Sequence, residues 1–125
     1  GYVNENELPS HAALRELSEE CMVEGRIIGV QAIRERLLKG IPAIFIAYLV
    51  ELPNDQNPTP GEEVLETRFV HADEFDTLEW ISDAMRSMAN SAVNSNQTLQ
   101  TIDYEPSQGH PYMLHTLSKS WGGEA

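Results

Sequence analysis

The sequence has one cysteine, few basic residues and no long apolar run. Cys21 is the single cysteine, so the chain forms no internal disulfide, and this predicts a reducing, cytoplasmic location. Lys and Arg total 8 against 20 Asp and Glu, giving a formal net charge of −12. Nucleic-acid binding needs basic side chains that displace counterions, so no nucleic-acid partner is expected. Residues 43–50 form the longest apolar run, far short of the roughly 18 residues of a membrane span, so no membrane association is expected.

What is present is the composition of an ordinary globular domain. The 125 residues are 41% hydrophobic and 22% charged, enough to form one hydrophobic core. We therefore expect a single domain over residues 1–125. A bound divalent cation can reverse the local sign of an acidic cleft, so a phosphorylated small molecule remains compatible with the charge. A salt-adapted or simply very soluble protein is the alternative explanation of the acidity.

Apolar periodicity predicts helices and strands in an α/β (α+β) arrangement. The expected elements are a helix over 8–21 with Pro9 in its first turn, strands over 26–33, 41–51 (well buried) and 64–71 (half-buried), and a helix over 80–93. Ser82 is the expected N-cap of the second helix and Ile81 part of its core face. Residues 94–125 are expected to be irregular, with 110–117 as a short strand or docking segment. This sheet is thin for two helices.

Three carboxylates share one face of the first predicted helix. Glu16, Glu19 and Glu20 are related as i, i+3 and i+4, so they lie together, away from the apolar stripe. A solvated acidic surface is the commoner explanation of such a pattern. The alternative is a site for Mg²⁺ or Mn²⁺, which prefer carboxylate and phosphate oxygens.

The wider spacing resembles a known signature. From Gly1 the segment is G-x5-E-x7-R-E-L-x-E-E-x-M-V, which resembles the box of the Nudix hydrolases, G-x5-E-x7-R-E-U-x-E-E-x-G-U, where U is a bulky aliphatic residue. The matching residues are Gly1, Glu7, Arg15, Glu16, Leu17, Glu19, Glu20 and Val23. The resemblance covers residues 1–23 directly and extends loosely to about residue 93. The stretch GEEVLETRFVHADEF is similar to the acidic loop, strand and turn that usually follow the box.

The resemblance implies a Nudix-type α/β/α sandwich with a mixed sheet, in which residues 1–23 form a loop–helix–loop. It implies that Glu16, Glu19 and Glu20 bind Mg²⁺ or Mn²⁺, with Glu19 and Glu20 also counted as catalytic. Arg15 and Glu7 would form the ion pair that fixes the loop against the helix. A general base after the box is implied, with Glu63 first, Glu66 second and Glu62 third. A solubilising role is an equally good explanation for each of these three.

The implied reaction is attack of a metal-activated water on the diphosphate of a nucleoside diphosphate linked to a group X. Pro42 weakly favours an ADP-ribose-like substrate, although a proline also suits the start of a strand. The alternatives are a nucleoside triphosphate house-cleaning pyrophosphatase, a catalytically weak binding or regulatory domain, and an acidic globular protein with a fortuitous motif. The residues that would bind the nucleoside are not indicated.

Two features depart from the family pattern. Met22 stands where the family has glycine, and we expect the helix to run slightly longer and end at Gly25. The chain also starts at the box, so the strands that normally precede it are not in this sequence. They would belong to an unseen upstream part, or a homodimer would complete the sheet.

Overall fold

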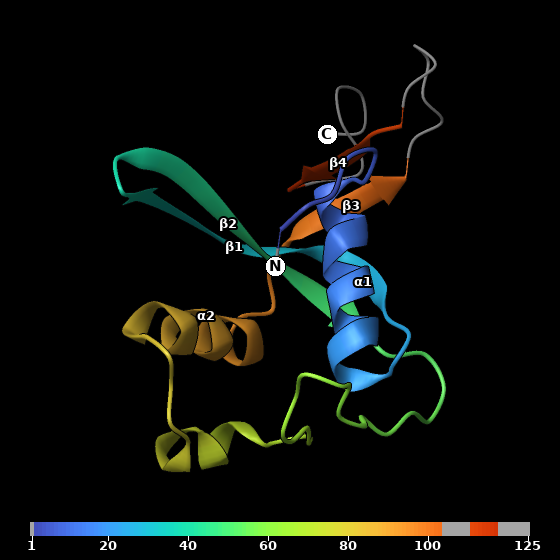
Figure 1. Cartoon of the computed structure of the whole chain (residues 1–125), viewed down its shortest axis with the longest axis vertical. Coiled ribbons are helices and arrows are strands. Elements are labelled where there is room, and N and C mark those ends of the chain that lie inside the picture. The colour runs from blue at the N-terminus through green and yellow to red at the C-terminus, as the bar shows by residue number, and fades with distance from the viewer. Residues whose placement is uncertain (1, 104–110, 118–125) are drawn as a thin grey trace.

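The computed structural model describes residues 2–103 and 111–117, and Gly1 of the box and His110 lie outside this range (Figure 1). The helices are α1 (Pro9–Cys21), the 3₁₀ helix η1 (Ala72–Thr77) and α2 (Asp83–Asn94). The strands are β1 (Arg26–Leu38), β2 (Ile41–Glu51), β3 (Leu99–Asp103) and β4 (Met113–Thr116). None of the helices among these residues is long and apolar enough to cross a membrane.

The sheet is built on one long hairpin. β1 and β2 pair along their whole length, from Arg26 opposite Glu51 to Leu38 opposite Ile41. Lys39 and Gly40, with φ of 52° and 80°, turn the chain between them, and two positive φ values are typical of a type I′ hairpin turn. β3 pairs with β1 and β4 with β3, so the order is β2-β1-β3-β4 and β2 lies at an edge.

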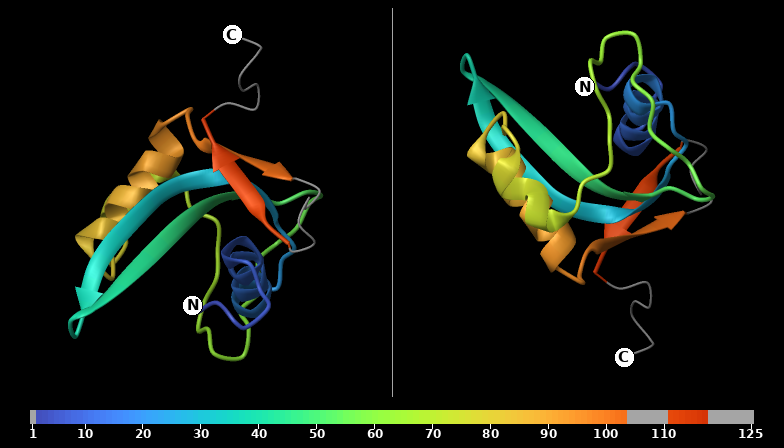
Figure 2. Two further views of the ribbon diagram at one scale, coloured as in Figure 1. Left: turned by 90° about the horizontal axis from the view of Figure 1, so that it is seen from above. Right: turned by 90° about the horizontal axis from the view of Figure 1, so that it is seen from below.

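The two α-helices lie on opposite sides of the curved hairpin (Figure 2). α1 contacts β1 and β2, and α2 contacts β1. This arrangement confirms the α/β class and the α/β/α layering expected from the sequence. All pairs among the described strands are antiparallel, however, so the expectation of a mixed sheet is wrong for this part of the chain. The buried apolar side chains are few, namely Ala12, Val23, Val30 and Phe75.

Several predicted strands differ from the observed ones. Residues 34–38 were expected to lie outside the strands. They pair with β2, so the first strand continues through them. No residue of β2 is fully buried, and Ile44 is 69% exposed, because β2 is an edge strand. Residues 64–71 form no strand. Their start is instead held in a turn, in which the Val64 N–H donates to the Gly61 carbonyl.

The C-terminal part of the chain contains two strands, of which only the second was considered from the sequence. Within residues 94–125, which were expected to be irregular, β3 and β4 pair with each other. The segment expected at 110–117 is a strand over Met113–Thr116. Both strands are short, and pairing with β1 at Gly29 and Val30 stabilises β3 in a way that local sequence does not reveal.

The predicted helices are present with small differences at their ends. Pro9 is in the first turn of α1, and the Met85 N–H donates to the Ser82 hydroxyl, which caps α2 as expected. Placing Ile81 on the core face of this helix was wrong. It precedes the cap and is 94% exposed, because the helix begins only at Asp83.

Met22 ends α1 in the left-handed conformation. Its φ is 59° and its ψ 37°, and its N–H donates to the Ser18 carbonyl. The expectation that the helix would continue to Gly25 was therefore wrong. A side chain disfavours this backbone conformation, yet Met22 adopts it where the family pattern has glycine.

We expect Met22→Gly to stabilise the fold. Relief of about 1–2 kcal/mol of left-handed strain is partly offset by roughly 0.4–1 kcal/mol of extra entropy in the unfolded chain, leaving a gain of about 0.5–1 kcal/mol. Urea unfolding of the two proteins measures the difference. Met22→Ala is the matched control, because alanine keeps the Cβ, and it should give no gain. An equal gain in stability in both variants would contradict the proposed backbone strain at Met22.

Candidate active site

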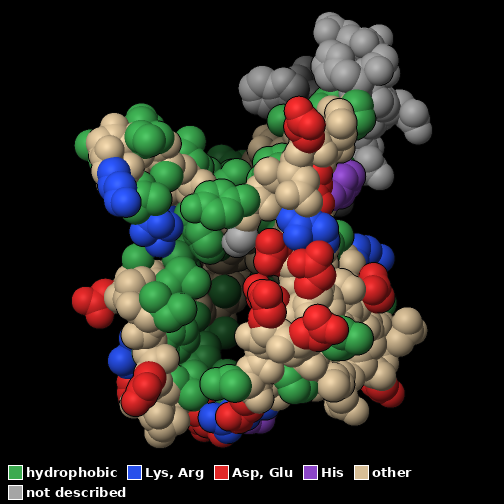
Figure 3. Space-filling model, in the orientation of Figure 1, with side chains coloured by type: hydrophobic (Ala, Val, Ile, Leu, Met, Phe, Trp, Pro, Cys, Tyr) green, Lys and Arg blue, Asp and Glu red, His purple; other side chains and the backbone are tan. Residues whose placement is uncertain are grey.

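One face of α1 holds the charged residues of the box. Glu16 is half-buried, and Glu19 and Glu20 are exposed. Figure 3 shows acidic side chains gathered over this helix, beside basic ones. The helical spacing expected from the sequence is therefore formed, and the three carboxylates lie on the same side of the fold.

Arg15 connects this face to the segment before the helix. Its Nε lies 2.8 Å from Glu7 Oε2 and its Nη2 lies 3.2 Å from Glu7 Oε1, a two-point ion pair. Nη2 also donates to the Tyr2 carbonyl at 3.0 Å. Nη1 lies 3.3 Å from a carboxylate oxygen of both Glu16 and Glu19. One guanidinium thus contacts three carboxylates and ties residues 2–7 to α1.

The ion pair between Glu7 and Arg15 is electrostatically favourable. The hydrogen bonds from Arg15 hold the pKa of the Glu7 carboxyl below its usual range, and the N–H of Asn4, 3.0 Å from Glu7 Oε1, acts in the same direction. The Glu7 carboxylate in turn raises the pKa of Arg15 above its ordinary value. Both groups are therefore charged at neutral pH.

A loop after β2 brings two further carboxylates to the same place. The Thr59 N–H donates to the Cys21 carbonyl at 2.8 Å, and the Gly61 N–H donates to the Glu20 carbonyl at 3.0 Å. A cavity of about 480 Å³ lies between this loop and the helix. Its lining residues are Glu16, Glu19, Glu20, Met22, Gly61, Glu62, Glu63 and Val64. Five glutamates thus line one cavity.

Of the three residues considered as a general base, two line this cavity. Glu62 and Glu63 line it together with Glu16, Glu19 and Glu20. Glu66 does not. It lines a different cavity together with Leu17 and Cys21, and its carboxylate lies 3.5 Å from Arg68 Nε. The structure thus separates Glu66 from the acidic face of α1.

The donor chemistry of the cavity suits a divalent cation. Hard cations such as Mg²⁺ and Mn²⁺ take oxygen ligands, and five of the eight residues that line this space are glutamates. In residues 2–103 and 111–117, no three His, Cys, Asp or Glu side chains converge closely enough to hold an ion. Glu16 and Glu19 instead point toward Arg15 Nη1. The residues fit a metal by type, and their side chains would have to turn to bind it.

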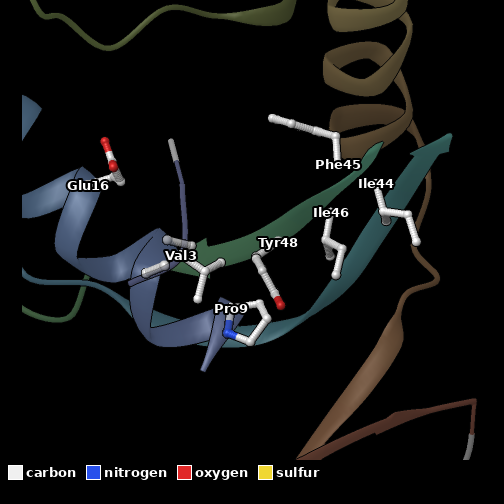
Figure 4. A pocket seen from close by; sticks show the side chains of 9 residues that line it. Val3, Pro9, Glu16, Ile44, Phe45, Ile46 and Tyr48 are labelled. Atoms are coloured by element: carbon white, nitrogen blue, oxygen red, sulfur yellow. The ribbon is translucent and has the colours of Figure 1, made fainter. Parts of the chain in front are cut away.

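A second, apolar cavity adjoins the acidic one. It has a volume of about 440 Å³, and Glu16 lines both. Figure 4 shows that Ile44, Ile46 and Tyr48 point to one side of β2 and Phe45 to the other. The cavity is lined by α1 and by this edge strand. Burial raises the pKa of the Tyr48 hydroxyl, which is therefore neutral at physiological pH.

Sequence reasoning missed two features of the site. The contact of Gly61 with α1 joins residues about 40 positions apart, and no periodicity signals such a contact. The apolar cavity depends on β2 being an edge strand, which only the sheet order reveals.

One comparison with known proteins agrees with the motif. The family model described as the NUDIX domain matches residues 1–90 of this chain. The chain therefore belongs to the Nudix family, whose members hydrolyse the diphosphate bond of nucleoside diphosphate derivatives and generally use divalent cations. It is a pyrophosphohydrolase that acts on small nucleotide substrates. Neither the curated proteins nor the solved structures gave a match.

We expect the Glu7–Arg15 pair to make stability depend on pH. Because the pKa of Glu7 is lower in the folded state, the pair stabilises the fold at neutral pH, and this contribution is lost as the pH falls through the folded pKa. Glu7→Gln should therefore be less stable than the wild type at pH 7. The difference should shrink below about pH 4. Urea unfolding of both proteins between pH 7 and pH 3 measures this difference in stability. A difference that does not change with pH would contradict a stabilising Glu7–Arg15 ion pair.

Proposed function

We propose that this chain hydrolyses a nucleoside diphosphate linked to another group, with ADP-ribose-like compounds favoured as substrates, and that residues 1–125 act as one Nudix domain. The observation that supports this proposal is the cavity surrounded by five carboxylates, three from the helix of the box and two from the loop after β2. A polyanionic diphosphate enters such a space together with divalent cations, which neutralise the repulsion.

Glu16, Glu19 and Glu20 are the proposed ligands of Mg²⁺ or Mn²⁺. The bound metal supplies a water of lowered pKa and polarises the phosphoryl oxygens. Binding requires Glu16 and Glu19 to exchange the Arg15 contact for a metal contact, and Glu19, which is exposed, has room to turn. Arg15 stays bound to Glu7 through its Nε and keeps α1 attached to residues 2–7.

Glu63 is the proposed general base that takes a proton from the attacking water. It lines the cavity on the loop side, opposite the proposed metal ligands. Glu62 lines the same cavity and is the alternative. Glu66 is the least supported of the three, because it lines another cavity and pairs with Arg68.

We expect Glu20→Gln to lower the metal-dependent kcat/KM by about 100-fold or more, because it removes a proposed metal ligand. The assay measures nucleoside monophosphate release from ADP-ribose, diadenosine polyphosphates, NADH and deoxynucleoside triphosphates, with and without Mg²⁺ or Mn²⁺. Glu35→Gln on the exposed end of β1 makes the same chemical change away from the cavity and should leave activity unchanged.

The substrate panel also separates the alternatives. Turnover confined to deoxynucleoside triphosphates would contradict the proposed substrate class and indicate a house-cleaning pyrophosphatase that hydrolyses nucleoside triphosphates. Metal or nucleotide binding in a calorimeter without turnover would indicate a binding or regulatory domain. Equal activity of Glu20→Gln and the wild type would contradict the proposed metal site.

A homodimer that completes the sheet is also proposed. β2 is an edge strand without a charged residue from Ile41 to Val50, and unpaired edges of this kind tend to pair with another strand. The exposed large apolar residues include Ile33, Leu37, Leu38, Ile41 and Ile44 on this hairpin. Two antiparallel β2 strands related by a two-fold axis would cover one another.

Ile44→Lys should convert such a dimer to a monomer, because a charged side chain on an edge strand opposes pairing. Ile44 is 69% exposed, so the change should leave the monomer folded. Light scattering coupled to size exclusion measures the mass. Leu65→Lys is the matched control, since Leu65 is fully exposed outside the sheet. A wild type with the mass of a single chain would contradict the dimer.

A further inference from the structure

The loop that carries Glu62 and Glu63 is attached to the end of α1 through its backbone. Its two attachments are the N–H groups of Thr59 and Gly61, which donate to the carbonyls of Cys21 and Glu20. The last carbonyls of a helix have no partner within the helix, so the loop supplies the donors that they need. The attachment therefore involves the same helical turn that carries Glu19 and Glu20.

Gly61 is the point of closest approach. A Cβ on this residue would lie 1.9 Å from the Glu19 carbonyl oxygen and 3.1 Å from its carbonyl carbon. Both are backbone atoms within a helix, which cannot move aside as the end of a flexible side chain could. Gly61 has no positive φ, so the requirement is for space and not for an unusual conformation. Any larger residue would push the loop away from α1.

The two glutamates follow Gly61 directly. A turn closed by the Val64 N–H and the Gly61 carbonyl, 3.1 Å apart, fixes the path of Glu62 and Glu63 relative to the glycine. Both side chains line the acidic cavity, where like charges repel them from the helix. The backbone attachment at Gly61 holds them there against this repulsion.

We propose that Gly61 is a positioning residue of the active site, which acts through Glu63 by seating the acidic loop against the last turn of α1. This inference rests on the proposed function, since it assigns Gly61 a role in placing the proposed general base. The absence of a side chain at position 61 sets the distance between Glu63 and the carboxylates of the helix. A small displacement of a catalytic group is enough to slow a reaction substantially.

A double-mutant cycle tests the proposal. Gly61→Ala should lower kcat by about 10- to 100-fold, as expected for a misplaced catalytic group, with KM and the Kd for Mn²⁺ within about twofold of the wild type. In a Glu63→Gln background the same substitution should lower kcat by less than about twofold, because the group on which it acts is already gone. Equal losses in the two backgrounds would overturn the proposal, as would wild-type kcat in Gly61→Ala.

Gly40→Ala is the matched control. Gly40 is in the hairpin turn with open space around its Cα, so an alanine there strains the backbone without approaching the site. It should lower stability and leave kcat unchanged. If Gly61→Ala does not fold, Thr59→Pro is the second variant. It removes the other backbone donor of the loop and should lower kcat in the same Glu63-dependent way.

A measurement that does not use turnover separates the two proposals. Mn²⁺ bound by the α1 carboxylates should broaden the amide signals of Glu62 and Glu63 in the NMR spectrum, and Gly61→Ala should reduce this broadening relative to that of α1. A wild type with broadening but no turnover of any substrate contradicts the proposed hydrolase while supporting the seating of the loop. Broadening of the loop signals that is the same in both proteins would overturn the role of Gly61.

Discussion

Repulsion between carboxylates is the constraint on which the site depends. Glu16, Glu19 and Glu20 share a helix face, and the loop adds two more carboxylates across a single cavity. Arg15 offsets part of this repulsion by contacting Glu16 and Glu19 while it is held by Glu7. The loop is held by backbone hydrogen bonds, which do not depend on side-chain charge. The arrangement keeps like charges close together, as a site for cations requires.

The parts of the fold that follow from local pattern were predictable. The apolar stripe and Pro9 indicated α1, and Ser82 indicated the start of α2. The two strands of the hairpin were predicted from their β-branched and apolar residues, although β1 proved longer. β3 was missed because its short sequence is stabilised by pairing with the distant β1, whereas β4 lies within residues 110–117, where a short strand was one of two expectations. Residues 64–71 alternate like a strand but pair with none of the strands that the structure describes.

The site was predictable where its residues are close in sequence. Helical spacing indicated that Glu16, Glu19 and Glu20 share a face, and the resemblance implied the Glu7–Arg15 pair. The structure brings Glu7, Glu16 and Glu19 into contact with Arg15. The general base was harder to predict, because the loop after β2 carries three candidate glutamates that the local sequence does not distinguish. Tertiary structure distinguishes them, since Glu62 and Glu63 line the acidic cavity and Glu66 does not. The importance of Gly61 is a matter of backbone distance and has no local signal.

The division of the contacts along the chain has a consequence for folding. The described contacts that form the acidic cavity join residues between Tyr2 and Val64, and the hairpin between α1 and the loop is itself a local element. β3, by contrast, pairs with β1 through Gly29 and Gln100, which closes a much longer stretch of chain. Local contacts form sooner, because closing a long loop has a greater entropic cost. We therefore expect the contacts of the acidic cavity to form earlier during folding than the pairing of β3 with β1.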